Sequence, residues 1–299
     1  MCDNIYGDFW MLKNDKTKGI IYIIVSAFFF ALMGLFVKLS GDLPVMQKSF
    51  FRNFVAMIFA LVLIIKNREW ALPKGKNISY LFIRAIAGTS GILCNFYALS
   101  NMNLADASML NKLSPFFAII FSLFILKEKA NLKQIFAIIL AFIGALFVMK
   151  PSFSLEGLPA FIGFLGGLGA GLAYACVRKL TKNGFKGSLI IFYFSAFSCL
   201  VTLPWLIFDF TPMSIKQWLY LILAGLCASG GQYFITTAYS KAPAKEISIY
   251  DYSQIIFTTL LSLVVFGDLP DILSFVGYAI IIAAAIFNAW NSLKKSSSN

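Results

Sequence analysis

Histidine is absent from this 299-residue chain, and charged residues make up only 13% of it. Soluble globular proteins contain about a quarter charged residues, so this shortage, together with 60% hydrophobic residues, excludes an ordinary soluble domain. Because no imidazole is present, any coupling of the protein's activity to protons must run through carboxylates. The GxxxxGK[ST] loop that binds nucleotide phosphates is also missing, which argues against use of ATP by the chain itself.

The sequence also lacks the patterns typical of metal sites, disulfides and nucleic-acid binding. None of the five cysteines forms a CxxC pair, so the sequence predicts no disulfide, no metal site and no cofactor. The net charge of +12 is spread over many short loops, without a basic helix or an aromatic-rich basic patch. Nucleic acid is therefore not an expected partner. Residues 1–18 are polar and carry no cleavable signal pattern.

An internal repeat is the most informative positive feature. When the sequence is shifted by 140 positions, which places Gly91 on Gly231, its two halves align without a gap over roughly sixty residues. The matched pairs include Ala98 with Ala238, Ser108 with Ser248, Asp106 with Glu246 and Asn111 with Asp251. A duplicated membrane unit with an odd number of spans gives two halves of opposite orientation, which is the architecture of many secondary transporters.

Ten apolar segments are predicted to cross a bilayer, whose core requires about 20 residues of helix, and the fifth of them is shorter than the rest. They lie near Gly19–Ser40, Val45–Ile65, Ser79–Leu99, Leu104–Leu126, Gln134–Met149, Leu158–Val177, Ser188–Phe208, Gln217–Tyr239, Ala244–Phe266 and Ile272–Trp290. The sequence thus predicts an all-α polytopic membrane protein with ten transmembrane helices in two inverted five-helix repeats. The repeats are residues 19–150 and 151–291, between cytoplasmic tails at 1–18 and 292–299.

Basic residues orient the predicted bundle. Eighteen of the 25 lysines and arginines lie in loops on one side, whereas only Lys150 and Lys216 lie on the other. Loops rich in lysine and arginine remain in the cytoplasm. We therefore expect a multi-pass protein of the cell's inner (plasma) membrane with both termini in the cytoplasm.

The chain resembles the ten-span, EamA-type members of the drug/metabolite transporter superfamily. The resemblance is carried by Phe51-Arg52, by the stretch Ala98–Lys129 with its Ser114-Pro115 step, and by IGALFVMKP at Ile143–Pro151. The second repeat departs from the pattern, because its second span has no counterpart to Arg52. The resemblance implies a central cavity lined mainly by spans one, three, four, six, eight and nine, with spans five and ten at the periphery. It implies no particular substrate.

Ionisable residues at membrane depth are costly and are candidates for function. Asp251 lies about two turns into the ninth predicted span, between Tyr250 and Tyr252 and three residues before Gln254. A carboxylate beside aromatic rings can bind an ammonium group through charge and cation–π attraction. The alternative is that Asp251 only stabilises the bundle by pairing with Lys112 or Arg52.

Lys112 occupies a similar position in the fourth predicted span, next to Asn111, the repeat mate of Asp251. Counting ~1.5 Å per helical residue in a ~30 Å core leaves ~8 Å between the levels of Lys112 and Asp251. Such a gap would suit a zwitterion with its carboxylate toward Lys112 and its amine toward Asp251. A direct salt bridge between the two side chains is the alternative.

Arg52 follows Lys48 by four residues, so both can face one side of the second span. The favoured interpretation of Arg52 is a structural or gating ion pair with Asp42 or Asp106, and direct contact with substrate is the alternative.

Further polar residues lie in or beside the predicted spans. Asn95, Gln232 and Tyr233 could line a mostly apolar cavity or simply bond neighbouring helices. Asp106 and Glu246 open their helices, where a carboxylate complements the helix dipole. Together with Asp251 and Arg52 they are the candidates for coupling or gating.

These features favour a secondary transporter, an exporter or exchanger, that moves a small polar, amine-containing or zwitterionic metabolite by alternating access through a central cavity. The alternative is a multispan membrane enzyme acting on lipid or isoprenoid substrates, which would ordinarily carry interfacial clusters of Asp, His or Arg. The expected partners are the metabolite and the lipid bilayer, and the sequence leaves open whether two copies form a homodimer.

The orientation can be tested by labelling single cysteines with an impermeant thiol reagent. We expect Lys76→Cys and Lys182→Cys to react only from the cytoplasmic side, and Ser154→Cys and Thr211→Cys only from outside, because the basic loops remain inside. Labelling of all four from one side would contradict the inverted repeat.

Overall fold

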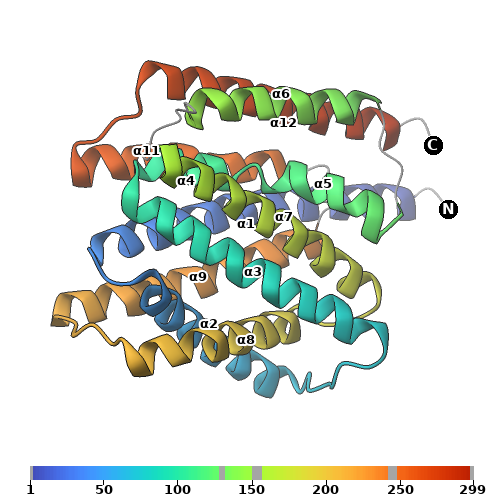
Figure 1. The fold of residues 1–299 in the computed structure, drawn as a ribbon. Coiled ribbons are helices and arrows are strands. Elements are labelled where there is room, and N and C mark those ends of the chain that lie inside the picture. Colours follow the sequence, from blue (N-terminus) through green and yellow to red (C-terminus); the bar gives the residue numbers. More distant parts are fainter. Residues whose placement is uncertain (1–2, 128–131, 150–156, 242–247, 297–299) are drawn as a thin grey trace.

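The computed structural model describes residues 3–127, 132–149, 157–241 and 248–296, and within these ranges the chain is helical with short connections and no β-strand. The helices are α1 (Asp3–Leu39), α2 (Val45–Asn67), α3 (Lys76–Asn101), α4 (Leu104–Asn111), α5 (Ser114–Ile125), α6 (Leu132–Met149), α7 (Leu158–Lys182), α8 (Gly187–Phe208), α9 (Ile215–Lys241), the 3-10 helix η2 (Ser248–Tyr252), α11 (Ser253–Phe266) and α12 (Ile272–Ser296). The helices run roughly side by side, and α1 begins at the same end of the bundle at which α12 ends (Figure 1).

The helices have the length and surface of a polytopic membrane protein. Among the described residues, seven segments are long and apolar enough to cross a membrane, with α4 and α5 counted together, and three shorter apolar helices lie in α6, η2–α11 and α12. Large apolar side chains such as Leu200, Phe208 and Val264 are 68%, 88% and 80% exposed. In water such a surface would be unfavourable, but in lipid it is the expected exterior. The all-helical polytopic fold is therefore present. Helix α1 is longer than the predicted first span, because it begins at Asp3.

The fourth predicted span is interrupted. Pro115 has no N–H, so the carbonyl of Asn111 loses its usual helical partner, and α4 ends at Asn111. The amides of Phe116 and Phe117 both bond to the carbonyl of Leu113, at 3.0 and 3.2 Å. The carbonyl of Lys112 is thereby released from the helical ladder.

The ninth predicted span is interrupted at the equivalent place. The 3-10 helix η2 ends at Tyr252, and α11 begins at Ser253. Tyr252 is the repeat mate of Lys112 in the 140-residue shift. Each of these two predicted spans is thus built from two helical pieces, and the two interruptions meet inside the bundle.

The glycines of α7 allow close helix approach on two sides. A Cβ on Gly169 would lie 2.8 Å from the carbonyl oxygen of Ala87 on α3, and one on Gly167 would lie 2.6 Å from that of Leu110 on α4. Only glycine fits at such distances, because a backbone atom cannot move aside as a side chain can.

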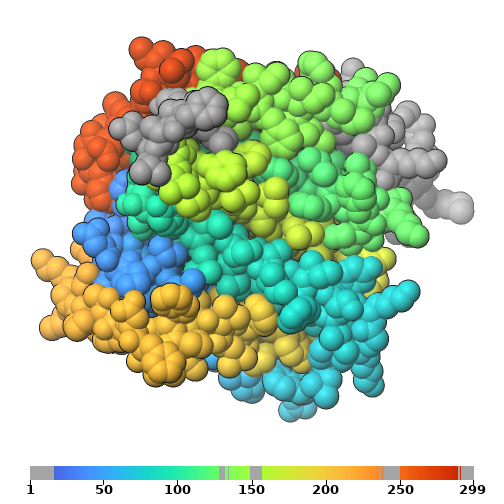
Figure 2. Space-filling model, in the orientation of Figure 1, coloured from blue at the N-terminus to red at the C-terminus, as the bar shows by residue number. Residues whose placement is uncertain are grey.

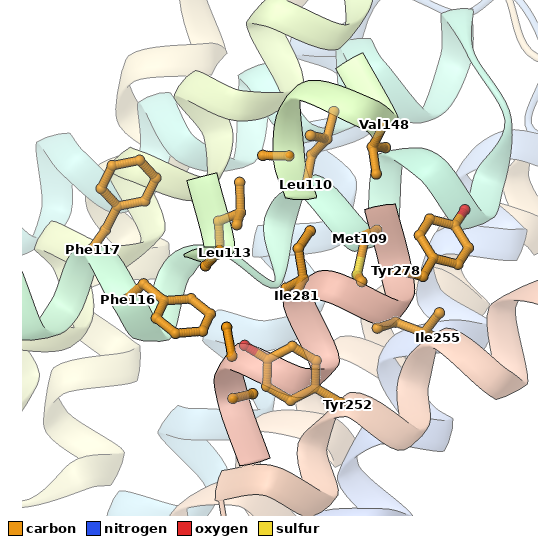
Figure 3. Packing of buried hydrophobic residues seen from close by; sticks show 14 of the residues in the cluster. Met109, Leu110, Leu113, Phe116, Phe117, Val148, Tyr252, Ile255, Tyr278 and Ile281 are labelled. Atoms are coloured by element: carbon orange, nitrogen blue, oxygen red, sulfur yellow. The ribbon is translucent and has the colours of Figure 1, made fainter. Parts of the chain in front are cut away.

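The pair formed by α6 and α12 lies along one edge of the bundle (Figure 1), opposite the edge formed by α8 (Figure 2). A buried apolar cluster joins this pair to the two helix interruptions; its members include Leu110, Leu113, Phe116, Tyr252, Ile255, Tyr278 and Ile281 (Figure 3). At its margin the hydroxyl of Tyr278 donates a 2.6 Å hydrogen bond to Asp106. The peripheral position of α6 and α12 agrees with the resemblance.

The seam between α3 and α7 can be tested by adding bulk to it. Gly169→Leu should lower the free energy of unfolding by about 1–3 kcal/mol, because the new side chain has only backbone to displace. Thermal unfolding of the detergent-purified protein would measure the loss. Leu165→Phe on the same helix is the matched control, since Leu165 is 38% exposed and has room for extra volume. Equal stability of the two variants would contradict the close approach.

Candidate functional site

A central cavity of about 100 Å³ lies between the helices. Of the substrate-binding residues predicted from the sequence, seven line it: Arg52, Asn95, Asn111, Lys112, Gln232, Asp251 and Gln254. They come from both halves of the chain, on α2, α3, α4, α9, η2 and α11 and at the C-cap of α4. The cavity is therefore shared between the two repeats, and α2 and α8 contribute to it in addition to the helices that the resemblance implies.

Lys112 and Asp251 form a buried ion pair in this cavity. The Lys112 Nζ lies 2.5 Å from Asp251 Oδ2, and the two side chains are 7% and 11% exposed. The other carboxylate oxygen, Oδ1, has no hydrogen-bond partner within the described part of the chain. The direct salt bridge is thus the arrangement present.

The helix interruptions hold this pair in place. Lys112 is the C-cap of α4, with φ −72° and ψ 2°, and its released carbonyl oxygen accepts a 3.0 Å hydrogen bond from the Tyr252 hydroxyl. Asp251 precedes Tyr252 in the single turn of η2. Two contacts therefore join the interruptions, one between charged side chains and one from a phenol to a carbonyl.

The aromatic cage predicted around Asp251 is not formed by its neighbours. Successive residues of a 3-10 helix point about 120° apart, so Tyr250 and Tyr252 cannot face the same group as Asp251. Tyr252 is buried in the apolar cluster beside α12 (Figure 3), and Tyr250 is 39% exposed. Neither lines the cavity, whereas Tyr174 of α7 does.

Other predicted positions lie away from the cavity. Tyr233 is 44% exposed and packs edge-on against Phe59 and Phe234. Asp106 accepts the hydrogen bond from Tyr278 and does not line the cavity. Glu246 lies outside the described residues.

Arg52 is 3% exposed and lines the cavity instead of joining Asp42 or Asp106 in a gating pair. One of its terminal nitrogens donates a 2.6 Å hydrogen bond to the Asn53 side chain. Its Nε has no partner within the described ranges. The expected ion pair with an aspartate was therefore wrong, because Arg52 faces inward and Asp106 bonds to α12.

Arg84 is a cavity residue that we did not predict from the sequence. It lies on α3, is 6% exposed, and its guanidinium carbon lies 4.1 Å from the ring centroid of Phe194 on α8. The signal was present, because an arginine inside an apolar span is costly and rarely accidental. With Arg84 the cavity holds three cationic side chains and one carboxylate among the residues described.

Apolar helices of membrane-spanning length around a cavity lined by buried charges define a membrane transporter. The chain belongs to the EamA-like transporter family, whose model matches residues 17–150 and again residues 157–290. The two matches correspond to the two halves of the internal repeat.

Individual relatives are similar over most of the chain. The pseudopaline exporter of Pseudomonas aeruginosa is 30% identical over 279 residues, which cover 92% of this chain and 97% of that protein. Solute carrier family 35 member G1 of Mus musculus is 28% identical over 84% of this chain and 73% of its own length. A crystal structure with a TM-score of 0.63 and 15% identity covers 90% of this chain and 96% of that one, which establishes likeness of fold alone.

The central ion pair can be tested with a double-mutant cycle. Asp251→Asn should lower the free energy of unfolding by about 3–5 kcal/mol, because it leaves a buried ammonium without its counter-ion. Lys112→Met in the same chain removes that ammonium and should recover most of the loss. Thermal unfolding of the Asp251→Asn, Lys112→Met and double variants gives the coupling energy, and additive losses would show that the two side chains do not act as a pair.

Proposed function

We propose that this protein is a secondary transporter, an exporter or exchanger, that moves a small polar metabolite with amine and acidic groups by alternating access through the central cavity. The observation that carries the proposal is the Lys112–Asp251 ion pair, buried in a cavity at the place where two interrupted helices meet. Interrupted helices near the centre of the bilayer form the binding sites of many secondary transporters.

The proposal includes ten crossings in two inverted repeats. With α4–α5 and η2–α11 each counted as one crossing, the helix contacts come in pairs that a twofold axis in the membrane plane would exchange: α1 packs on α9 as α3 packs on α7, while α2 packs on α8 and α6 on α12. Such pairing is what inverted repeats require.

Individual contacts support the same symmetry. The Ser26 hydroxyl donates a 2.8 Å hydrogen bond to the carbonyl of Gly231. In the 140-residue shift Ser26 corresponds to Gly166 and Gly231 to Gly91. At that second place, a Cβ on Gly91 would lie 3.2 Å from the carbonyl oxygen of Gly166. The same helix contact therefore recurs in both halves with different side chains.

The ion pair suggests how a substrate could exchange with the protein's own charges. A carboxylate of the substrate would replace Asp251 at the ammonium of Lys112, and an amine of the substrate would replace Lys112 at the carboxylate of Asp251. Between transport cycles Lys112 and Asp251 satisfy each other, so neither of these two charges is left uncompensated in the empty cavity. Exchange of this kind would loosen the contact between the two helix interruptions only when substrate is present.

The cavity of about 100 Å³ is smaller than the ~300–1,000 Å³ of ordinary ligand sites. A whole metabolite therefore requires the bundle to open, which alternating access provides. Outward direction is proposed because a relative is named an exporter. A plasma-membrane location with cytoplasmic termini is proposed because the basic loops lie at the end where α1 begins and α12 ends (Figure 1).

The test is flux from proteoliposomes loaded with a metabolite mixture, with mass spectrometry of the external solution. We expect a small subset of polar metabolites to leave. Asp251→Asn should abolish accumulation driven by a pH gradient and leave substrate-for-substrate exchange detectable, because exchange needs no net movement of protons.

Asp209→Asn is the matched control, since Asp209 is an exposed carboxylate at the C-cap of α8. Normal gradient-driven accumulation by the Asp251→Asn variant would show that Asp251 does not carry the coupling. Absence of flux for every metabolite would refute the transporter proposal itself.

A further inference from the structure

Two arginines in the cavity have hydrogen-bonding capacity that the protein does not use. Arg52 on α2 and Arg84 on α3 are 3% and 6% exposed. Within the described ranges, Nε of both residues and one terminal nitrogen of Arg84 lack any hydrogen-bond partner. A guanidinium carries five N–H donors and keeps its charge. Burying such a group without a partner is costly in a membrane protein, so these donors require an explanation.

The surrounding residues hold both guanidinium groups in position. The Asn53 side chain, which accepts from Arg52, donates to the Ser49 carbonyl and to the Ser198 hydroxyl of α8, each at 2.9 Å. The orientation of that amide, and hence of its oxygen toward Arg52, is therefore fixed from two sides. This preorganisation is typical of a binding residue whose contacts must be ready before a ligand arrives.

Arg84 is held by different means. Its guanidinium stacks on Phe194 and lies across Gly88, where a Cβ would overlap its terminal nitrogen. Gly88 also lines the cavity. Because glycine has no side chain, Gly88 leaves the space in which the Arg84 guanidinium lies. The cation–π contact with Phe194 of α8 holds the guanidinium from the other helix.

The protein itself does not balance these charges. Asp251 is the one carboxylate among the described residues that line the cavity, and it pairs with Lys112. Arg52 and Arg84 line the same cavity, so their positive charges also repel each other. An anionic group placed between them would satisfy the free donors and remove the repulsion at once.

We propose that Arg52 and Arg84 bind a carboxylate or phosphate group of the transported metabolite, separately from the Lys112–Asp251 pair. Two guanidinium forks suit the planar oxygens of a carboxylate or the oxygens of a phosphate. This assignment rests on the proposed transport function and narrows it: the substrate carries more acidic groups than amines and is a net anion. Purely cationic amines are then poor substrates.

Binding of matched four-carbon probes to the purified full-length protein in detergent tests this site. The probes are succinate, succinamide and 1,4-diaminobutane, which differ in charge but little in length, compared by thermal unfolding at equal ionic strength. We expect succinate to raise the unfolding midpoint and the other two not to. Arg52→Gln and Arg84→Gln should each raise the succinate concentration for half-maximal stabilisation at least tenfold, because charge-assisted hydrogen bonds are lost.

Matched variants separate binding from folding. Arg68→Gln, at the exposed end of α2, should respond to succinate like the unaltered protein. The Arg→Lys variants keep the charge but not the fork, so their affinity should be intermediate. Without ligand, the Arg→Gln variants should have unfolding midpoints no lower than that of the unaltered protein, because each removes a buried charge that lacks a counter-ion. If the arginine had a purely structural role, its replacement would lower the unfolding midpoint. Gly88→Ala should weaken succinate binding by displacing Arg84, and it serves if a glutamine variant does not fold.

Three outcomes would overturn the assignment: stabilisation by 1,4-diaminobutane in place of succinate, no stabilisation by any of the three probes, or equal stabilisation of the Arg→Gln variants and the unaltered protein. Transport is judged separately. Succinate binding without flux of any metabolite would refute the transporter proposal and leave the anion site standing. Flux without an effect of either arginine would refute the anion site alone.

Discussion

The contact between the two helix interruptions is the interaction on which the rest of the structure depends. Lys112 supplies its ammonium to Asp251 and its released carbonyl oxygen to the hydroxyl of Tyr252. Each of these groups would be costly to bury alone, because lipid offers neither a counter-ion nor a hydrogen-bond donor. Each interruption supplies what the other lacks, so the two broken helices are stable as a pair. The cavity and its charged residues follow from that pairing.

The helical architecture could be predicted closely from the sequence, because length and apolarity decide which segments form membrane helices. The interruption after α4 was signalled by Pro115, which cannot donate to the helical ladder. The interruption at Tyr252 was not signalled, since Ile255 stands where the first half has Pro115. There the 3-10 turn is stabilised by a partner 140 residues away, through the bond from Tyr252 to Lys112. Such a tertiary cause is invisible in local sequence.

The sequence predicted which residues line the candidate site better than it predicted how their side chains are arranged. Lys112 and Asp251 were identified because buried charges in lipid are costly, and both line the cavity. Their direct contact was left open, because depth counted along ideal helices says nothing about how far a lysine side chain reaches. The aromatic cage was wrong because the direction of a side chain depends on the helix type, which the sequence did not reveal. Arg84 was missed because the sequence shows how deep a residue lies in a span but does not show which face of the helix meets the cavity.

The two seams between the halves are packed differently although the repeat relates them. Between α3 and α7, Gly91 meets Gly166 as backbone against backbone, whereas between α1 and α9 the ring of Phe30 lies against Gly231. Backbone cannot yield, but an aromatic ring can turn about its side-chain bonds. Identical seams would give the two sides of an inverted-repeat carrier equal free energies of opening. In the alternating-access carrier that we propose, unlike seams would make those free energies differ, and the empty protein would rest with one side of the membrane favoured over the other.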